Sequence, residues 1–354
     1  NRCMQVSNFY DVMLTGEEDG TVFGSEDCLY LNVFSPKKKF VNNEKLPVML
    51  WIHGGGNTWG YSASPEHIPE NFLKFHDVIL VTINYRLGPL GWFSLDEIRD
   101  NGESSLDQTS NFGTLDMIKS LEWVGQNIEK FGGDPNNVTI FGESAGGRNV
   151  MSLMVTPQSK NLFKRCIVQS GYLASDSIEF SENDKRAGSK SFLSNLIKTK
   201  QPLMDESQIE DLLKDSNYVY DLLMKVSAEE IISFYRIRED AGGLIDVPNV
   251  IPDNLVIPSY GIFNAFKNGN IHDKEIILGT NRDENKLFMI DNNNFVKRLP
   301  KFLTDIYPPL GLWAKPKDKK FYDLYAKYRS DAWKLDAVDN AARYINESNS
   351  SNVY

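Results

Sequence analysis

The sequence predicts an α/β protein with a mostly parallel central sheet and helices on both faces. Five short apolar segments, rich in β-branched residues, are predicted to be its strands: 47–52, 77–86, 137–141, 164–171 and 275–280. Over 113–131 apolar residues recur every three or four positions, which indicates a helix that ends at Gly132 and Gly133. Nearly continuous apolar strands that alternate with helices are typical of a parallel sheet buried on both faces.

Length and composition indicate one folded domain over 1–354. Hydrophobic residues make up 41% and charged residues 24% of the chain, proportions that argue against disorder. Large α/β domains reach this length as a single unit. Residues 172–260 are helical and polar, and we expect them to form inserted helices over the sheet rather than a second domain. The sequence does not predict an oligomeric state.

Charge and hydropathy exclude two classes of partner. The net charge is −10, so the chain has no electrostatic reason to bind nucleic acid or an anionic membrane surface. No apolar run approaches the roughly 18 residues that a membrane-spanning helix needs, so we expect no integral membrane segment.

A serine lies in a glycine-rich turn after the third predicted strand. Residues 142–146 match the pattern G-x-S-x-G, with Ser144 at its centre. The flanking glycines suit a sharp strand-to-helix turn, where a side chain would clash and the backbone is strained. The pentapeptide alone is a weak signal, but a preceding strand is the context that a nucleophilic serine requires.

A second glycine cluster, His53-Gly54-Gly55-Gly56, follows the first predicted strand. Ligand sites in parallel sheets lie at the carboxyl ends of the strands, so we expect both clusters to meet in one crevice. Bare backbone amides there would stabilise an oxyanion, and the candidates are Gly55, Gly56 and Ala145. The alternative is a flexible turn. We expect His53 to be structural rather than a general base.

An acidic pair, Asp283 and Glu284, follows the last predicted strand. A serine nucleophile works with a histidine that a buried carboxylate orients, so either residue is a candidate for that carboxylate. The alternative is an ordinary solvated acid in a loop.

The three cysteines are Cys3, Cys28 and Cys166. Cys166 lies in an apolar run and is expected to be buried and inert. Composition leaves open whether Cys3 and Cys28 pair.

Taken together, these motifs resemble the type-B carboxylesterase/cholinesterase family of α/β-hydrolases, and bacterial carboxylesterases in particular. The matching stretches are 25–36, 47–56, 81–94, 111–147 and 279–288. The resemblance implies an α/β-hydrolase fold and a serine carboxylic-ester hydrolase that acts on small-molecule esters without a metal or organic cofactor. The inserted helices would lie over the active site.

The resemblance also implies roles for single residues. Ser144 would be the nucleophile and Glu284 the acid of the triad, with Gly55, Gly56 and Ala145 forming the oxyanion hole. Glu143 would be a buried carboxylate near the site, and Ser170 would lie next to the acid. Cys3 and Cys28 would form the family's first disulfide, which favours a secreted or periplasmic protein.

Two positions depart from the family pattern. An aromatic residue usually follows the three glycines, where this chain has Asn57, and this change would alter the acyl pocket. Glycine often follows the acidic pair, where this chain has Asn285.

The histidine of a triad is missing from its expected place. The fold orders the triad as serine, acid and histidine, but all four histidines precede Glu284. We therefore expect the base outside this chain, which would be a fragment that lacks both termini. The alternative is an inactive relative, a non-catalytic binding or adhesion protein. A lipase that prefers long acyl chains is a third hypothesis.

Overall fold

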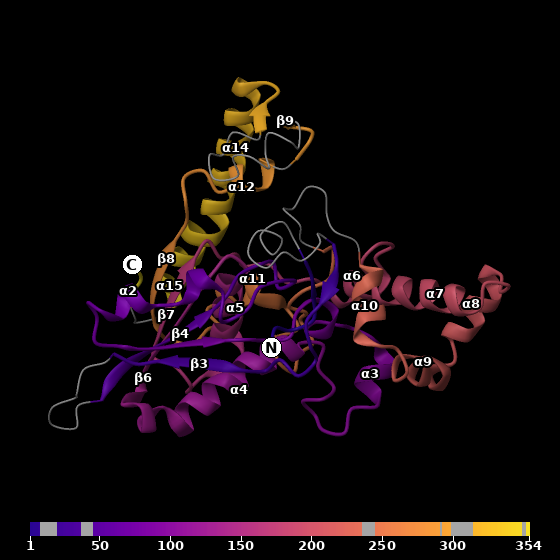
Figure 1. Cartoon of the computed structure of the whole chain (residues 1–354), viewed down its shortest axis with the longest axis horizontal. Coiled ribbons are helices and arrows are strands. Elements are labelled where there is room, and N and C mark those ends of the chain that lie inside the picture. The colour runs from indigo at the N-terminus through magenta and orange to yellow at the C-terminus, as the bar shows by residue number, and fades with distance from the viewer. Residues whose placement is uncertain (8–19, 37–44, 236–244, 291, 299–313, 349–351) are drawn as a thin grey trace.

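The computed structural model describes residues 1–7, 20–36, 45–235, 245–290, 292–298, 314–348 and 352–354. Its centre is a six-stranded sheet in the order β3-β5-β4-β6-β7-β8 (Figure 1). The strands are β3 Leu31–Phe34, β4 Leu46–Ile52, β5 Ile79–Ile83, β6 Gly133–Glu143, β7 Arg165–Gln169 and β8 Glu275–Gly279. β3 runs antiparallel to β5, and the other neighbours are parallel. The predicted parallel sheet is therefore confirmed, while β3 is a strand that the apolar segments did not predict.

The main hydrophobic core lies between this sheet and four helices. They are α4 Phe112–Asn127, α5 Ala145–Val155, α11 Gly261–Lys267 and α15 Ala341–Ser348. Leu50, Ile52 and Ile83 of the strands are completely buried, and α5 is buried along its whole length. Because side chains alternate along a strand, Trp51 and Phe141 point the other way and are only half-buried. Among the described residues, no helix is long and apolar enough to cross a membrane.

The inserted region begins with five helices, and all but the first share a core of their own. They are α6 Ile178–Asn183, α7 Ser189–Lys200, α8 Glu206–Leu213, α9 Ser216–Leu223 and α10 Ala228–Phe234. Capping boxes at Asp205 and Ser227 fix where α8 and α10 begin. The sequence places these helices over the sheet, but in the structure they extend to one side of it (Figure 1). Their core also takes in Val6 and Leu95, which join it to the strand pair β1 Gln5–Val6 and β2 Val22–Phe23 and to α3 Asp96–Asp100.

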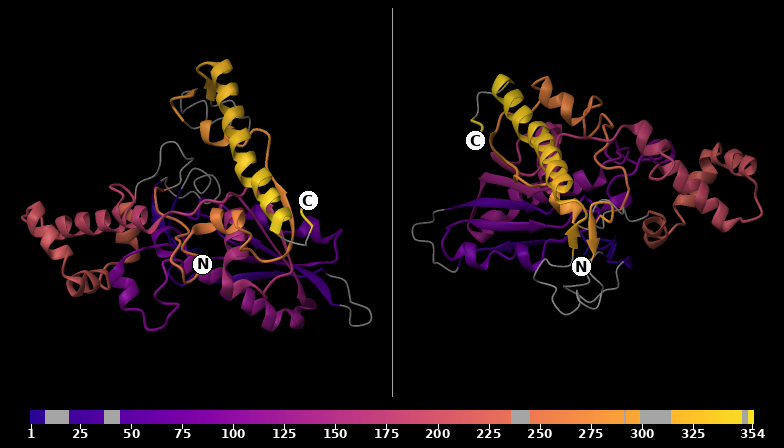
Figure 2. Two further views of the ribbon diagram at one scale, coloured as in Figure 1. Left: turned by 180° about the vertical axis from the view of Figure 1, so that it is seen from behind. Right: turned by 90° about the horizontal axis from the view of Figure 1, so that it is seen from above.

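An arm projects from the sheet beyond β8 (Figure 2). It consists of α12 Lys286–Met289, the strand pair β9 Val296–Arg298 and β10 Ala314–Pro316, and α14 Lys319–Lys334. A π-helical turn, Leu335–Asn340, joins α14 to α15, which returns the chain to the main core. Val353 then forms a parallel bridge with Ile276 on β8. The short helix α2 Glu70–Leu73 lies between β4 and β5 in the sequence.

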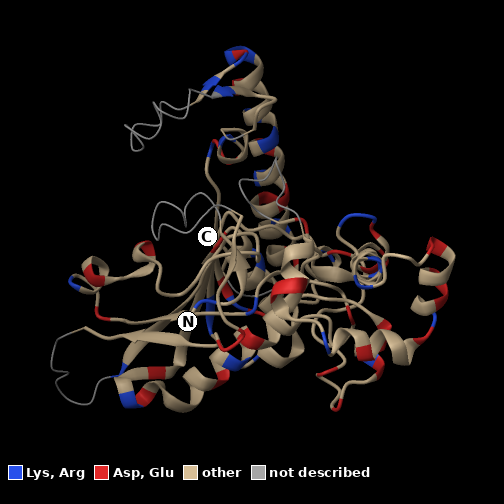
Figure 3. Cartoon of the chain, turned by 45° about the vertical axis from the view of Figure 1, so that its right-hand side comes forward, with Lys and Arg blue, Asp and Glu red and all other residues tan. Residues whose placement is uncertain are grey.

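Acidic and basic side chains are mixed rather than segregated. In Figure 3 both colours occur along the arm and along the inserted helices. The net charge of −10 is therefore distributed over several of the described elements.

The cysteines are arranged as expected. Cys3 and Cys28 form a disulfide with a sequence separation of 25, and Cys166 is a free, buried cysteine. The disulfide ties the amino-terminal segment to the segment that leads into β3.

We expect removal of this disulfide to destabilise the fold. Replacing Cys3 and Cys28 with serine should lower the free energy of unfolding by about 3 kcal/mol, because the unfolded chain gains the freedom of an open loop. Urea unfolding of the wild type and the double variant measures the difference. A reductant should destabilise the wild type and leave the variant unchanged; equal midpoints for the oxidised wild type and the variant would contradict the prediction.

Candidate active site

Ser144 occupies a strained turn between β6 and α5. Its backbone has φ 56° and ψ −120°, a region that a residue with a side chain rarely adopts. The turn is held from both sides: the Ser144 amide donates to the carbonyl of Gln169 at 2.9 Å, and the Ser144 carbonyl accepts from the amide of Arg148 at 3.0 Å. The serine side chain is half-buried at the carboxyl edge of the sheet.

The two glycines that flank this turn are required by close backbone contacts. A β-carbon on Gly142 would lie 2.5 Å from the backbone of Gly146, and one on Gly146 would lie 2.1 Å from the carbonyl oxygen of Ile52. Backbone atoms cannot move away as a flexible side chain can. These glycines therefore let the start of α5 pack directly against the end of β4.

The glycine cluster after β4 lies beside the serine. A β-carbon on Gly54 would be 3.3 Å from the β-carbon of Ser144. Gly55 and Gly56 have φ values of 95° and 64°, which glycine adopts without strain.

The backbone carbonyls of Gly54 and Gly55 accept hydrogen bonds from neighbouring residues of the protein. His53 Nδ1 lies 2.9 Å from the Gly54 carbonyl, and the amides of Thr58 and Trp59 donate to the Gly55 carbonyl at 3.0 and 3.1 Å. In a trans peptide the N–H points away from the C=O, so the amides of Gly55 and Gly56 point away from these partners. Among the described residues these two amides donate no hydrogen bond. The amide of Ala145, at the first position of α5, has no partner within the helix.

Glu284 is held on one side only. Its Oε1 accepts from the hydroxyl of Thr280 at 2.7 Å, from the amide of Asn281 at 2.6 Å and from the hydroxyl of Ser170. No hydrogen bond to the described residues uses Oε2. The carboxylate is therefore fixed in orientation with one oxygen still able to accept.

Asp283, the other half of the acidic pair, faces a different environment. It pairs with the exposed Arg282 at 2.8 Å and with Lys286 at 3.4 Å. Hydrogen bonds from Arg282 lower the pKa of Asp283, as expected for a solvated ion pair. The structure thus assigns the two acids different surroundings, which the sequence could not do.

The register of three parallel strands brings the serine and the acid to the same edge. Glu143, Gln169 and Gly279 are neighbours at the ends of β6, β7 and β8. Ser144, Ser170 and Thr280 therefore come next on adjacent strands. Ser170 is buried, and its amide donates to the carbonyl of Gly279 at 2.7 Å.

Glu143 differs from the expectation that it is a buried carboxylate. As the last residue of β6 it is exposed as a whole residue. Its carboxyl group still faces the protein on one side, where a β-carbon on Gly54 would lie 2.9 Å from its Oε2. Partial burial, and secondarily the negative charge of Glu284, raise the pKa of Glu143.

None of the four histidines takes part in this site as a base. His53 is buried and stacks on Tyr85 with ring centroids 4.4 Å apart, and burial lowers its pKa to about 3. It therefore stays neutral and holds the Gly54 carbonyl. The other three have partners elsewhere: His67 bonds to the Tyr61 carbonyl, His76 packs on Phe72, and His272 bonds to the Thr156 carbonyl.

The two departures from the family pattern are both buried. Asn57 is completely buried, with its side chain bonded to Asn149 and Asn249. The side-chain amide of Asn57 therefore faces the interior, and its effect on the acyl pocket stays a prediction. Asn285 is also buried, and its amide N–H bonds to the hydroxyl of Ser330 at 3.0 Å.

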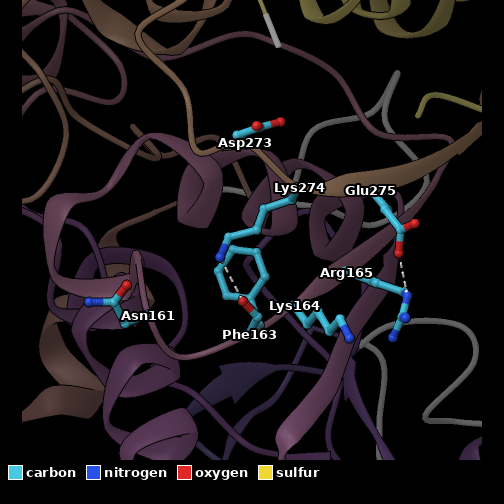
Figure 4. Close-up of a pocket in the computed structure, with 7 residues that line it drawn as sticks. All are labelled: Asn161, Phe163, Lys164, Arg165, Asp273, Lys274 and Glu275. Carbon is cyan, nitrogen blue, oxygen red and sulfur yellow. Dashed lines mark hydrogen bonds and ion pairs between the residues drawn. The ribbon is translucent and has the colours of Figure 1, made fainter. Parts of the chain in front are cut away.

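An open hollow of about 550 Å³ lies elsewhere, at the amino ends of β7 and β8 (Figure 4). Three of its charged groups have partners: Arg165 pairs with Glu275 at 2.6 Å, and Lys274 donates to the carbonyl of Phe163 at 2.8 Å. It contains none of the residues around Ser144. No cluster of three or more metal-ligating side chains occurs within the described ranges.

Sequence comparison finds similar chains among known esterases. The chain is 34% identical over 306 residues to a para-nitrobenzyl esterase of Bacillus subtilis (strain 168). The aligned residues cover 86% of this chain and 55% of that protein. It is 44% identical over 161 residues to a liver carboxylesterase of Sus scrofa, covering 46% of this chain and 26% of that protein. The match thus spans about half of the bacterial relative and about a quarter of the pig relative.

Solved structures show the same fold. A PNB esterase superimposes with a TM-score of 0.68 at 28% identity, covering 100% of this chain and 67% of the other. A carboxylesterase of Geobacillus stearothermophilus gives a TM-score of 0.63 at 25% identity, and the superposition covers 99% of this chain and 67% of the other. The model of the carboxylesterase family matches residues 1–325, so this chain, with an α/β-hydrolase fold, belongs to the carboxylesterase family.

Proposed function

We propose that the protein is a serine carboxylesterase and that Ser144 is its nucleophile. The observation that carries the proposal is the placement of a strained serine beside two backbone amides that point away from the protein's own carbonyls. Such preorganised donors stabilise the negative charge that develops on a carbonyl oxygen during acyl transfer. Small-molecule esters are the proposed substrates.

The reaction proceeds through an acyl-enzyme. The Ser144 oxygen attacks the ester carbonyl carbon while its proton passes to a histidine, and the amides of Gly55, Gly56 and Ala145 bind the oxyanion. Collapse of the tetrahedral intermediate breaks the bond to the alcohol, which leaves with the proton from the histidine. Water then attacks the acyl-enzyme in the same manner and releases the carboxylic acid.

Glu284 is the proposed acid that orients this histidine. Its free Oε2 can accept an imidazole N–H while Oε1 stays bonded to the loop, and a charged imidazolium is stabilised by a carboxylate in contact with it. Because the four histidines of the chain have other partners, we assign the base to a histidine other than these four.

The disulfide supports a location for the protein. Disulfides persist in oxidising compartments, so the bond between Cys3 and Cys28 favours a secreted or periplasmic protein.

Fluorophosphonate labelling tests the nucleophile. The full-length protein should react covalently with the probe, and Ser144→Ala should abolish the reaction because the attacking oxygen is gone. Ser120→Ala, which changes a half-buried serine on α4, is the matched control and should label like the wild type. A wild type that does not label, or a Ser144→Ala variant that does, favours a non-catalytic binding protein.

Glu284→Gln tests the acid. The neutral amide keeps the shape of the side chain but cannot stabilise an imidazolium, so kcat should fall by roughly 10³-fold with little change in stability. Asp283→Asn removes the neighbouring carboxylate and should leave kcat within about twofold, since Asp283 pairs only with surface cations. Hydrolysis of a chromogenic ester measures both; equal effects would refute the assignment of Glu284.

The neutral His53 predicts how stability depends on pH. Its pKa of about 3 lies below the usual 6.5, so between these values the unfolded chain binds a proton that the folded chain does not. The free energy of unfolding should therefore decrease as the pH falls through this window, by up to about 1.4 kcal/mol per pH unit.

His53→Asn isolates this contribution. Asparagine can still donate to the Gly54 carbonyl but does not titrate. Urea unfolding between pH 7 and pH 4 should give the variant a shallower slope, together with lower stability at pH 7 because the ring stacking on Tyr85 is lost. Identical slopes would show that His53 is protonated in the folded protein.

A further inference from the structure

Three buried asparagines meet behind the glycine loop. Asn57 follows Gly56 directly, Asn149 lies on α5 five residues after Ser144, and Asn249 lies in the segment that returns from the inserted helices. We call these three residues the amide cluster. Asn57 and Asn149 have no exposed surface, and Asn249 is 8% exposed.

Asn57 and Asn149 form a reciprocal pair. Asn57 Nδ2 donates to Asn149 Oδ1 at 3.1 Å, and Asn149 Nδ2 donates to Asn57 Oδ1 at 2.7 Å. Two opposed hydrogen bonds between amides fix their distance and their relative orientation. They join the glycine loop to the helix that begins beside Ser144.

Asn249 completes the cluster and contacts the glycine loop itself. Its Oδ1 accepts from Asn57 Nδ2 at 2.7 Å, and its Nδ2 donates to the carbonyl of Gly56 at 3.0 Å. The carbonyls of Gly54, Gly55 and Gly56 are thus all held, by His53, by the Thr58–Trp59 turn and by Asn249 respectively.

Further hydrogen bonds hold the amide cluster in place, with Tyr85, Arg148 and Asp176. The hydroxyl of Tyr85, two residues past the end of β5, lies 3.2 Å from Asn57 Oδ1 and 2.6 Å from the His53 carbonyl. Asn249 is fixed through its backbone, where its amide donates to Asp176 at 2.8 Å and its carbonyl accepts from the guanidinium of Arg148.

Both side-chain donor hydrogens of Asn57 are used. Nδ2 makes two donations and Oδ1 has two donors within reach, so a rotated amide would leave several buried groups without partners. The backbone of Asn57 is left-handed, with φ 59°, a conformation that asparagine tolerates better than most residues with a side chain. Both its backbone and its side chain are therefore restricted to one arrangement.

We propose that the amide cluster is a positioning device that fixes the oxyanion-binding amides of Gly55 and Gly56 relative to Ser144. The inference rests on the proposed esterase function. The three asparagines point into the protein, away from the substrate, and act only through the glycine loop and α5. Their effect falls on the chemical step and not on substrate binding, because the oxyanion develops only when the serine attacks the carbonyl.

Two variants test this proposal in the full-length protein. Asn149→Ala removes one half of the reciprocal pair. Asn57→Gly removes the other half while keeping the left-handed backbone without strain. Asn84→Ala is the matched control, since Asn84 is also buried and bonded through its amide, but to the carbonyls of Asn1 and Cys28.

Three measurements separate positioning from a merely structural role. In both test variants kcat and the rate of fluorophosphonate labelling should fall roughly 10- to 100-fold, with KM nearly unchanged. Affinity for a trifluoromethyl ketone, which forms an oxyanion on the serine, should fall in parallel. The double variant should lose little more than either single variant, because both changes break the same pair.

The outcomes are distinguishable. The proposal is supported if Asn84→Ala loses stability in urea but keeps its kcat, while Asn149→Ala and Asn57→Gly lose kcat. Test variants that label and turn over like the wild type, or that change only KM, overturn it while the esterase function stands. A wild type that neither labels nor hydrolyses esters overturns the proposed function itself, and the positioning role with it.

Discussion

The close contact between the start of α5 and the end of β4 is the constraint on which the site depends. Gly146 packs against the carbonyl of Ile52 so tightly that no other residue fits. This contact holds the start of α5 next to the glycine loop, at the strained turn of Ser144. The buried branched residues of β4 and β5 keep the end of β4 fixed, so the strain at Ser144 is supported by the hydrophobic core.

Hydrogen bonds then orient the glycine loop and the carboxylate of Glu284. Each carbonyl of the glycine loop has a donor, either within the same stretch of chain or from Asn249, and one carboxylate oxygen of Glu284 has donors from two loops. Groups held in this way lose little freedom when charge develops nearby, which is why preorganised sites stabilise a transition state better than water does. The hydrophobic core therefore fixes where the backbone of the site lies, and the polar contacts fix how the glycine loop and the Glu284 carboxylate are oriented.

The sequence predicts the parts of the molecule that follow local rules. Strands β4 to β8 and helix α4 have apolar patterns that propensity and burial explain, and the glycine motifs indicate the turns around Ser144. β3 was missed because its residues are only half-buried, and Glu143 is exposed although the resemblance implied burial. The role of Asn57 could not be inferred, because its partners lie 92 and 192 residues away. No local pattern signals a contact over such separations.

The separate core of the inserted helices has a consequence for how the protein opens. Phe192, Val219 and Ile232 pack with one another and not with the sheet, so these helices can lose their structure as one cooperative unit while the sheet stays folded. Amide hydrogens of α7 to α10 would then exchange with solvent together, earlier than those of β4 to β6. Asn249 follows these helices in the chain and donates to the carbonyl of Gly56, so it links the inserted region to the glycine loop.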